Sequence, residues 1–169
     1  MKIESIQDLF EVSLQHIYDC EQKLVEKGLP AMVKASTTPE LKNAFEQHLQ
    51  ETRNHVTRLE RVFSICGLEA KTKDNDVLDE LTDEAQDMIK AIEASPLRDA
   101  ALIAGGNEVE HYEMAVYGTL VAMAQQMGVR EAAELLQQTL DEEKKADAKL
   151  TQIGEQSVNP RASQERRAA

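Results

Sequence analysis

Glutamate and histidine side chains interrupt the apolar stripes of four segments whose periodicity predicts long helices. In each segment apolar residues recur at three- and four-residue steps, and acids fall near the middle of the same helical face. Several carboxylates buried without compensation cost far more free energy than the roughly 5–15 kcal/mol by which a domain is stable. No Lys or Arg occupies these stripe positions, so the compensating charge comes either from bound protons or from bound cations.

The side-chain types at these positions favour iron or manganese. Carboxylates mixed with imidazole suit these metals better than zinc, for which closed sets of Cys and His are typical. Carboxylate di-metal bundles use a Glu from each of two helices and a Glu with a His from each of the other two. We therefore predict two metal ions, Fe with Mn as the alternative, held by Glu21, Glu51, His55, Glu110, Glu113, Glu143 and Asp147.

Other residues on these faces have two interpretations each. His48, three residues before Glu51, is a core histidine or a hydrogen-bond donor to a ligand, with direct metal binding as the alternative. Tyr117, one turn after Glu113, is a core tyrosine or a hydrogen-bond partner of a ligand. The periodicity of the second long segment leaves open whether Glu51 or Thr52 faces the core.

Glycine and proline divide the chain into four long helices and one short one. Thr38-Pro39 and Ser95-Pro96 predict capped helix starts, and Gly67 and Gly128 predict helix ends. The predicted helices cover about 5–27 with a resumption past Pro30 to 35, then 39–66, 77–93 for the short one, 97–127 and 130–156.

The lengths of the connections predict an all-α four-helix bundle. The segment between the second and third long helices is much longer than the other connections, which favours two helical hairpins joined by a crossover. An internal repeat supports the two hairpins, because residues 45–59 align with 134–150 so that Glu51 matches Glu143 and His55 matches Asp147. Residues 1–157 are predicted to form the bundle and residues 158–169, which lack an apolar period, a flexible tail.

Composition excludes several classes of function. The 169 residues carry a formal net charge of −12, which disfavours binding to nucleic acid. No apolar run approaches the roughly 20 residues that span a bilayer, and the first residues lack the pattern of a signal peptide, so we expect a cytoplasmic protein without a membrane partner. The two cysteines, Cys20 and Cys66, are expected to be buried thiols, and the acidic pair Asp141-Glu142 a solvated face.

Four segments carry a resemblance to a known family. IYDCEQKL, HLQETRNHVTRLERVF, RDAALIAGGNEVEHYEMAVYGTL and LDEEKKADAKL resemble signature segments of the YciE/YciF family of bacterial stress-response proteins, in the ferritin-like superfamily, and the chain looks closer to the YciF type. The resemblance spans about residues 5–157. It implies a ferritin-like bundle with an additional short helix, a homodimer and a di-metal centre. The sequence departs from the superfamily pattern where His55 follows Glu51 by four residues instead of three, and where Asp147 replaces a second histidine.

These observations predict a stress-response protein with a carboxylate-bridged di-iron centre. Such a centre supports oxidation of Fe(II), or reduction of O2 or peroxide as the small-molecule substrate. The sequence alone does not decide whether the protein is an enzyme. The alternative is a non-enzymatic, dimeric helical stress protein that acts through protein–protein interaction.

Overall fold

The computed structural model describes residues 2–165, which fold into five helical rods without a strand among them. The first rod comprises α1 (Ile6–Lys23), a π-helical turn η1 (Leu24–Gly28) and α2 (Leu29–Ala35). The second is α3 (Pro39–Ile65), followed by the shorter α4 (Asp76–Ala91) and by α5 (Pro96–Gln126). The last comprises α6 (Arg130–Ile153), a second π-helical turn η2 (Gly154–Val158) and α7 (Asn159–Glu165).

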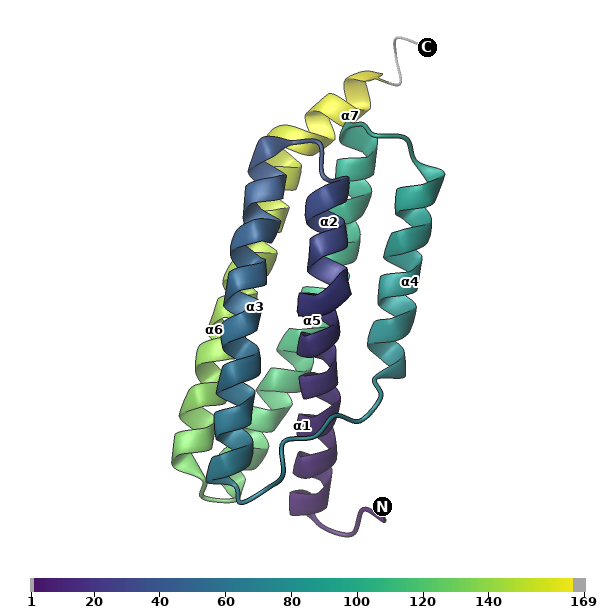
Figure 1. Ribbon diagram of the computed structural model, residues 1–169. Helices are drawn as coiled ribbons and strands as arrows, with labels where there is room; N and C mark the ends of the chain where they lie inside the picture. Colours follow the sequence, from purple (N-terminus) through teal and green to yellow (C-terminus); the bar gives the residue numbers. More distant parts are fainter. Residues whose placement is uncertain (1, 166–169) are drawn as a thin grey trace.

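Four of the rods form a bundle, and α4 lies outside it (Figure 1). Helix α1 contacts α3 and α5, and α6 contacts the same two helices, so α1 and α6 are diagonal to each other. Helix α4 packs against α5 within the long connection between the two hairpins. The predicted all-α bundle of two hairpins with a crossover and one short additional helix is therefore confirmed.

The crossover is anchored by a buried asparagine. Asn75 caps the start of α4, and its side-chain oxygen accepts a hydrogen bond from the backbone nitrogen of Leu78. Its own backbone nitrogen donates to Asp19 on α1, and its side-chain nitrogen donates to the hydroxyl of Tyr112 on α5. These contacts fix α4 against the bundle although it contributes only one fully buried apolar side chain, that of Leu78.

Each hairpin contains a π-helical turn immediately before an X-Pro pair. The sequence predicts a break at Gly28 and Pro30, but the first rod continues, because the backbone nitrogen of Leu29 bonds to the carbonyl of Leu24 five residues earlier. In η2 the nitrogen of Asn159 bonds to Gly154 in the same way, ahead of Pro160. The widened turn accommodates a proline, which lacks an N–H and crowds the preceding turn, without ending the rod.

The C-terminal segment is helical further than the sequence predicts. Val158 is fully buried and the helix continues to Glu165, although residues from 158 onward lack an apolar period. Residues 166–169 of the predicted tail lie outside the described part of the chain, and its flexibility remains a prediction.

The helix ends follow the predicted capping residues with one difference. Ser95 accepts a hydrogen bond from the nitrogen of Arg98, as an N-cap does, whereas the hydroxyl of Thr38 donates to Asp99 instead of capping its own helix. Gly67 and Gly128 have φ angles of 67° and 74°, the left-handed conformation that ends a helix.

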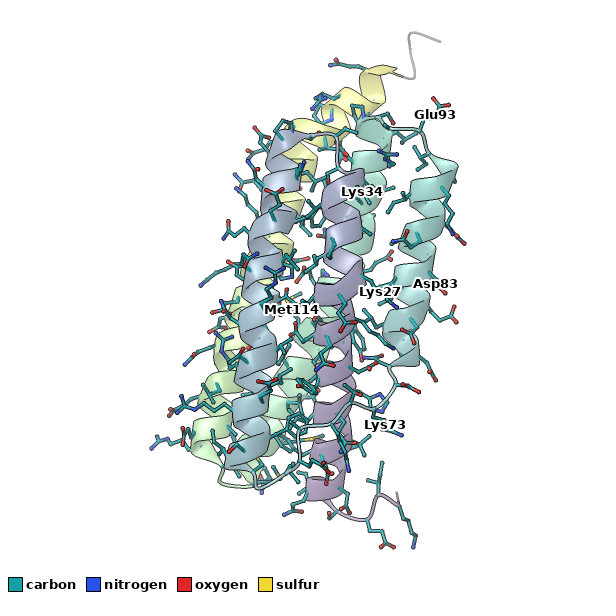
Figure 2. The ribbon with its side chains drawn as sticks, viewed as in Figure 1. Lys27, Lys34, Lys73, Asp83, Glu93 and Met114 are labelled. Atoms are coloured by element: carbon teal, nitrogen blue, oxygen red, sulfur yellow. The ribbon has the colours of Figure 1, made fainter. Side chains whose placement is uncertain are left out.

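Charged side chains cover the outer faces, as Figure 2 shows for Lys34 on α2 and Asp83 on α4. No helix in the described part of the chain is both long and apolar enough to cross a membrane. Inside the bundle, apolar side chains fill both ends and leave a polar layer between them. One end contains Phe10, Leu14, Phe63, Leu120 and Leu136, and the other contains Leu41, Phe45, Ile103, Leu150 and Ile153, all buried.

Candidate metal centre

The polar layer between the two apolar ends contains six ionisable side chains from the four bundle helices. None of them is more than 6% exposed. They are Glu21 on α1, His48 and His55 on α3, Glu110 and Glu113 on α5, and Glu143 on α6.

The six side chains form two groups that share one carboxylate. In the first, one atom each of His48, Glu110, Glu113 and Glu143 lies within 4.8 Å of all the others. In the second, Glu21, His55 and Glu143 meet the same limit. The two oxygens of Glu143 face different histidines: Oε1 is 3.0 Å from Nδ1 of His55, and Oε2 is 3.7 Å from Nε2 of His48. Glu143 therefore lies between two potential ion sites.

The other carboxylates complete each site. Nε2 of His48 is 3.1 Å from Oε1 of Glu110, and Nδ1 of His55 is 3.5 Å from Oε1 of Glu21. The centroids of the two imidazole rings are 6.3 Å apart, and the angle between the ring planes is 67°. Each half thus offers an imidazole nitrogen and carboxylate oxygens around one point, the donor set that suits iron or manganese.

Many polar atoms of the cluster lack a hydrogen-bond partner. One oxygen each of Glu21, Glu110 and Glu113, both oxygens of Glu143 and Nδ1 of each histidine are buried without one. A buried polar group left in this state costs about 1–3 kcal/mol, and a charged one costs more. Two divalent cations would carry as much positive charge as the four glutamates carry negative charge, so the residues fit a pair of such ions.

In the absence of cations, protons compensate the cluster. Burial, reinforced by the charges of Glu21 and Glu143, raises the pKa of Glu113 well above its usual value. Burial also raises the pKa of Glu143 to about 7, against the opposing influence of His55. Burial alone would lower the pKa of His55, but the neighbouring charges of Glu21 and Glu143 outweigh it and raise this pKa to about 10. Metal ions would therefore compete with protons for the same atoms.

Neighbouring side chains hold the cluster in place. The hydroxyl of the fully buried Tyr117 donates to Oε1 of Glu21, and the thiol of Cys20 lies 3.7 Å from Oε1 of Glu113. Tyr117 thus serves both predicted purposes, as a core side chain and as a partner of a candidate ligand. Cys20 is buried as expected, whereas Cys66 is only partly buried.

On the far side of His55, the structure corrects an expectation about Glu142. Its carboxylate is half-buried, with Oε2 2.9 Å from Nε2 of His55 and 2.8 Å from Nη1 of Arg58, and is not simply part of a solvated face. Arg58 also donates to the hydroxyl of Thr139, at 2.6 Å. The sequence pattern did not reveal the ion pair between Arg58 and Glu142, because it joins residues of two different helices.

The structure brings together five of the seven predicted ligands: Glu21, His55, Glu110, Glu113 and Glu143. The first group also contains His48. The sequence favoured a hydrogen-bonding role for this residue, with metal binding as the alternative.

Glu51 and Asp147 lie outside both groups. The side chain of Glu51 is 34% exposed and 3.6 Å from Nδ1 of His48, while Thr52 occupies the core position at 1% exposure. The side chain of Asp147 is 22% exposed and 3.2 Å from Nδ1 of His111. Between His48 and His55, either position 51 or position 52 can lie on the same helical face, because both fit steps of three and four residues. The rotation of α3 about its axis places Thr52 in the core.

Comparison with known proteins places the chain among similar bundles. The family DUF892, described as a domain of unknown function, matches residues 5–163. Protein YciF of Escherichia coli (strain K12) is 39% identical over 163 residues, which is 96% of this chain and 98% of that protein.

Solved structures show the same relationship. The crystal structure of the E. coli stress protein YciF matches with a TM-score of 0.89 and 39% identity, over 93% of this chain and 99% of that chain. The YcfI protein of Rhodopseudomonas palustris, provisionally described as structural, matches with a TM-score of 0.86 and 35% identity, over 89% of this chain and 95% of that one.

Proposed function

This chain belongs to the DUF892 family, and we propose that its buried carboxylate and imidazole cluster is a two-metal centre that acts in a stress response. Similarity to a protein described as a stress protein supports the setting, and the resemblance to the YciF type in the sequence is confirmed by the same comparison.

The position of Glu143 is the observation that carries the proposal. Its two oxygens face His55 and His48, and neither oxygen has a hydrogen-bond partner. A carboxylate that served only to balance a single histidine would not need a second imidazole on its other oxygen. Glu21, His55 and Glu143 would hold one ion, and His48, Glu110, Glu113 and Glu143 would hold a second, so that both oxygens of Glu143 would have a partner.

The protein supplies orientation and a dry environment to this centre. When bound, two iron ions would supply the electrons for reduction of O2 or peroxide, and manganese would be the alternative. Tyr117 holds one oxygen of Glu21 by a hydrogen bond, and Glu142 holds the far nitrogen of His55. The apolar side chains at both ends of the bundle exclude water from those two directions, and the low exposure of the cluster strengthens the interaction of the carboxylates with cations.

Metal content after reconstitution tests the proposal. The protein is refolded with Fe(II) or Mn(II) in the absence of oxygen, desalted, and its metal measured by mass spectrometry. We expect close to two ions per chain, and fewer than one in Glu143→Gln, which keeps the shape of the side chain but removes its charge. The exposed Glu134→Gln on the same helix is the matched control and should bind like the wild type. Fewer than about 0.3 ions per chain in the wild type would refute the proposal.

A second candidate is a non-enzymatic, homodimeric helical protein that acts by binding another protein. The structural description of the R. palustris relative favours it. Glu110→Ala distinguishes the two: if the variant loses metal but still protects cells under stress, the interaction accounts for the function. Light scattering checks the dimer by giving about twice the 18.9 kDa of one chain.

A further inference from the structure

A cavity of about 330 Å³ between α3 and α6 leads toward the first half of the cluster. Figure 1 shows these two helices side by side along the bundle. His48 and Glu110 line the inner part of the cavity, Phe45 and Leu150 form apolar walls, and Lys145 and Lys149 are exposed on α6 at its outer part. Its volume is at the lower end of the range of about 300–1,000 Å³ for small-molecule sites.

Two side chains of the cluster form the inner end of the cavity. Glu110 is 3% exposed and His48 is 6% exposed, and each has one side-chain atom that makes no hydrogen bond, Oε2 and Nδ1 respectively. Both side chains belong to the candidate metal centre, so the cavity ends on the centre, which distinguishes it from a groove on the solvated surface.

Charge at the outer part of the cavity selects against cations. Lys145 and Lys149 are one turn apart on α6, and within residues 2–165 neither has an acidic side chain at 4.0 Å or less. By contrast, Lys144 lies 3.5 Å from Asp141 and does not line the cavity. Of the two glutamates that line the cavity, Glu110 lies at the inner end and Glu51 is half-buried. The two ammonium groups therefore exceed the negative charge at the outer part, which attracts an anion.

The walls between the two ends are apolar. The side chains of Phe45 and Leu150 are 2% and 4% exposed, and Ala44 and Ala146 add two small side chains beside them. We propose that the cavity binds a small organic acid. Its carboxylate pairs with Lys145 and Lys149, and its apolar body lies against Phe45 and Leu150 and faces the cluster. This inference rests on the proposed function, for which it names the class of small molecule that reaches the centre.

Binding of hexanoate tests the inference. Calorimetry or nuclear magnetic resonance titration is performed on metal-free and on metal-loaded protein, with hexan-1-ol as the uncharged probe of similar size. We expect saturable binding of hexanoate in the millimolar range or tighter, and at least about tenfold weaker binding of hexan-1-ol. In the double variant Lys145→Gln and Lys149→Gln, hexanoate should bind at least about tenfold more weakly, while Lys144→Gln should bind within about twofold of the wild type.

Two results would overturn the inference: no saturable hexanoate binding up to about 10 mM, or equal binding of hexanoate by the wild type and the double variant. The metal content of each sample is measured independently. Absence of hexanoate binding in a protein that holds two ions overturns the cavity proposal alone. Hexanoate binding that depends on the two lysines, in a protein that takes up no metal, supports the cavity proposal and overturns the metal centre.

Discussion

Glu142 fixes which nitrogen of His55 faces the centre. Its Oε2 lies 2.9 Å from Nε2 of His55, and a carboxylate accepts hydrogen bonds only, so Nε2 carries the hydrogen. Nδ1 is then directed at Glu21 and Glu143, at 3.5 and 3.0 Å. Arg58 holds the same carboxylate with bonds of 2.8 and 3.2 Å, so the orientation of His55 depends on a chain of three side chains.

The variant Glu142→Ala is therefore expected to weaken metal binding. Loss of a partner that orients a metal-binding histidine reduces affinity by about 10–100-fold. A competition titration with a chelator measures the affinity, and nitrogen chemical shifts of His55 in the metal-bound protein report its tautomer. The neighbouring exposed Asp141→Asn is the control. Unchanged affinity together with an unchanged tautomer in Glu142→Ala would show that Glu142 does not position His55.

The stability of the metal-free protein should fall as the pH rises. Glu113 and Glu143 have raised pKa values in the folded state, and that of Glu143 is about 7. Their contribution to the free energy of unfolding is complete below the unfolded pKa of about 4.5 and is lost as the pH rises through the folded pKa. His55, with a folded pKa of about 10, acts in the same direction above pH 6.5. We expect the melting temperature to decrease by at least about 5 °C between pH 5 and pH 9. Bound metal should flatten this dependence, because cations replace the protons; a metal-free protein that is equally stable at both pH values would contradict the argument.

Glu113→Gln should stabilise the metal-free protein while removing metal binding. Burial disfavours the charged carboxyl of Glu113, and at pH 8 the folded protein must either bury this charge or bind a proton that the unfolded chain releases. A neutral amide avoids both costs. We expect unfolding in urea at pH 8 to require at least about 1 kcal/mol more than for the wild type, and fewer bound ions per chain. Glu134→Gln, on the exposed face of α6, should change neither. A destabilised Glu113→Gln would indicate that packing outweighs charge at this position.

The fold could be predicted from the sequence because its signals are local. Apolar periodicity and the caps Ser95 and Gly128 act within a few turns of one helix, and the crossover follows from the length of a single connection. The resumption past Pro30 was predicted, but the unbroken passage through Pro30 and the helix beyond Pro160 were not. Burial of Leu29 and Val158 by other helices decides whether a helix continues through a proline.

The candidate site was only partly predictable for a related reason. Acids within apolar stripes revealed Glu110, Glu113 and Glu143, whose positions leave no alternative on their helices. The choice between Glu51 and Thr52 depends on a rotation of α3 that tertiary packing sets. Glu142 could not be distinguished from a surface acid, because its partners His55 and Arg58 belong to a different helix. The available signal was Arg58, which follows the predicted ligand His55 by three residues on the same face of its helix and could have indicated a buried acidic partner.

Asp99 holds the connection of the first hairpin to the start of α5. It is fully buried and accepts hydrogen bonds from the backbone nitrogens of Thr37 and Thr38, at 2.8 and 2.7 Å, and from their hydroxyls, both at 2.6 Å. In Asp99→Ala these four donors lose a charged acceptor, and bonds to charged groups contribute about 1.5–3 kcal/mol each before the groups rearrange. We therefore expect the free energy of unfolding to fall by at least about 3 kcal/mol, measured in urea. The exposed Asp83→Ala on α4 should stay within about 0.5 kcal/mol of the wild type. If the two variants proved equally stable, the hydrogen bonds of Asp99 would not contribute to joining the two hairpins.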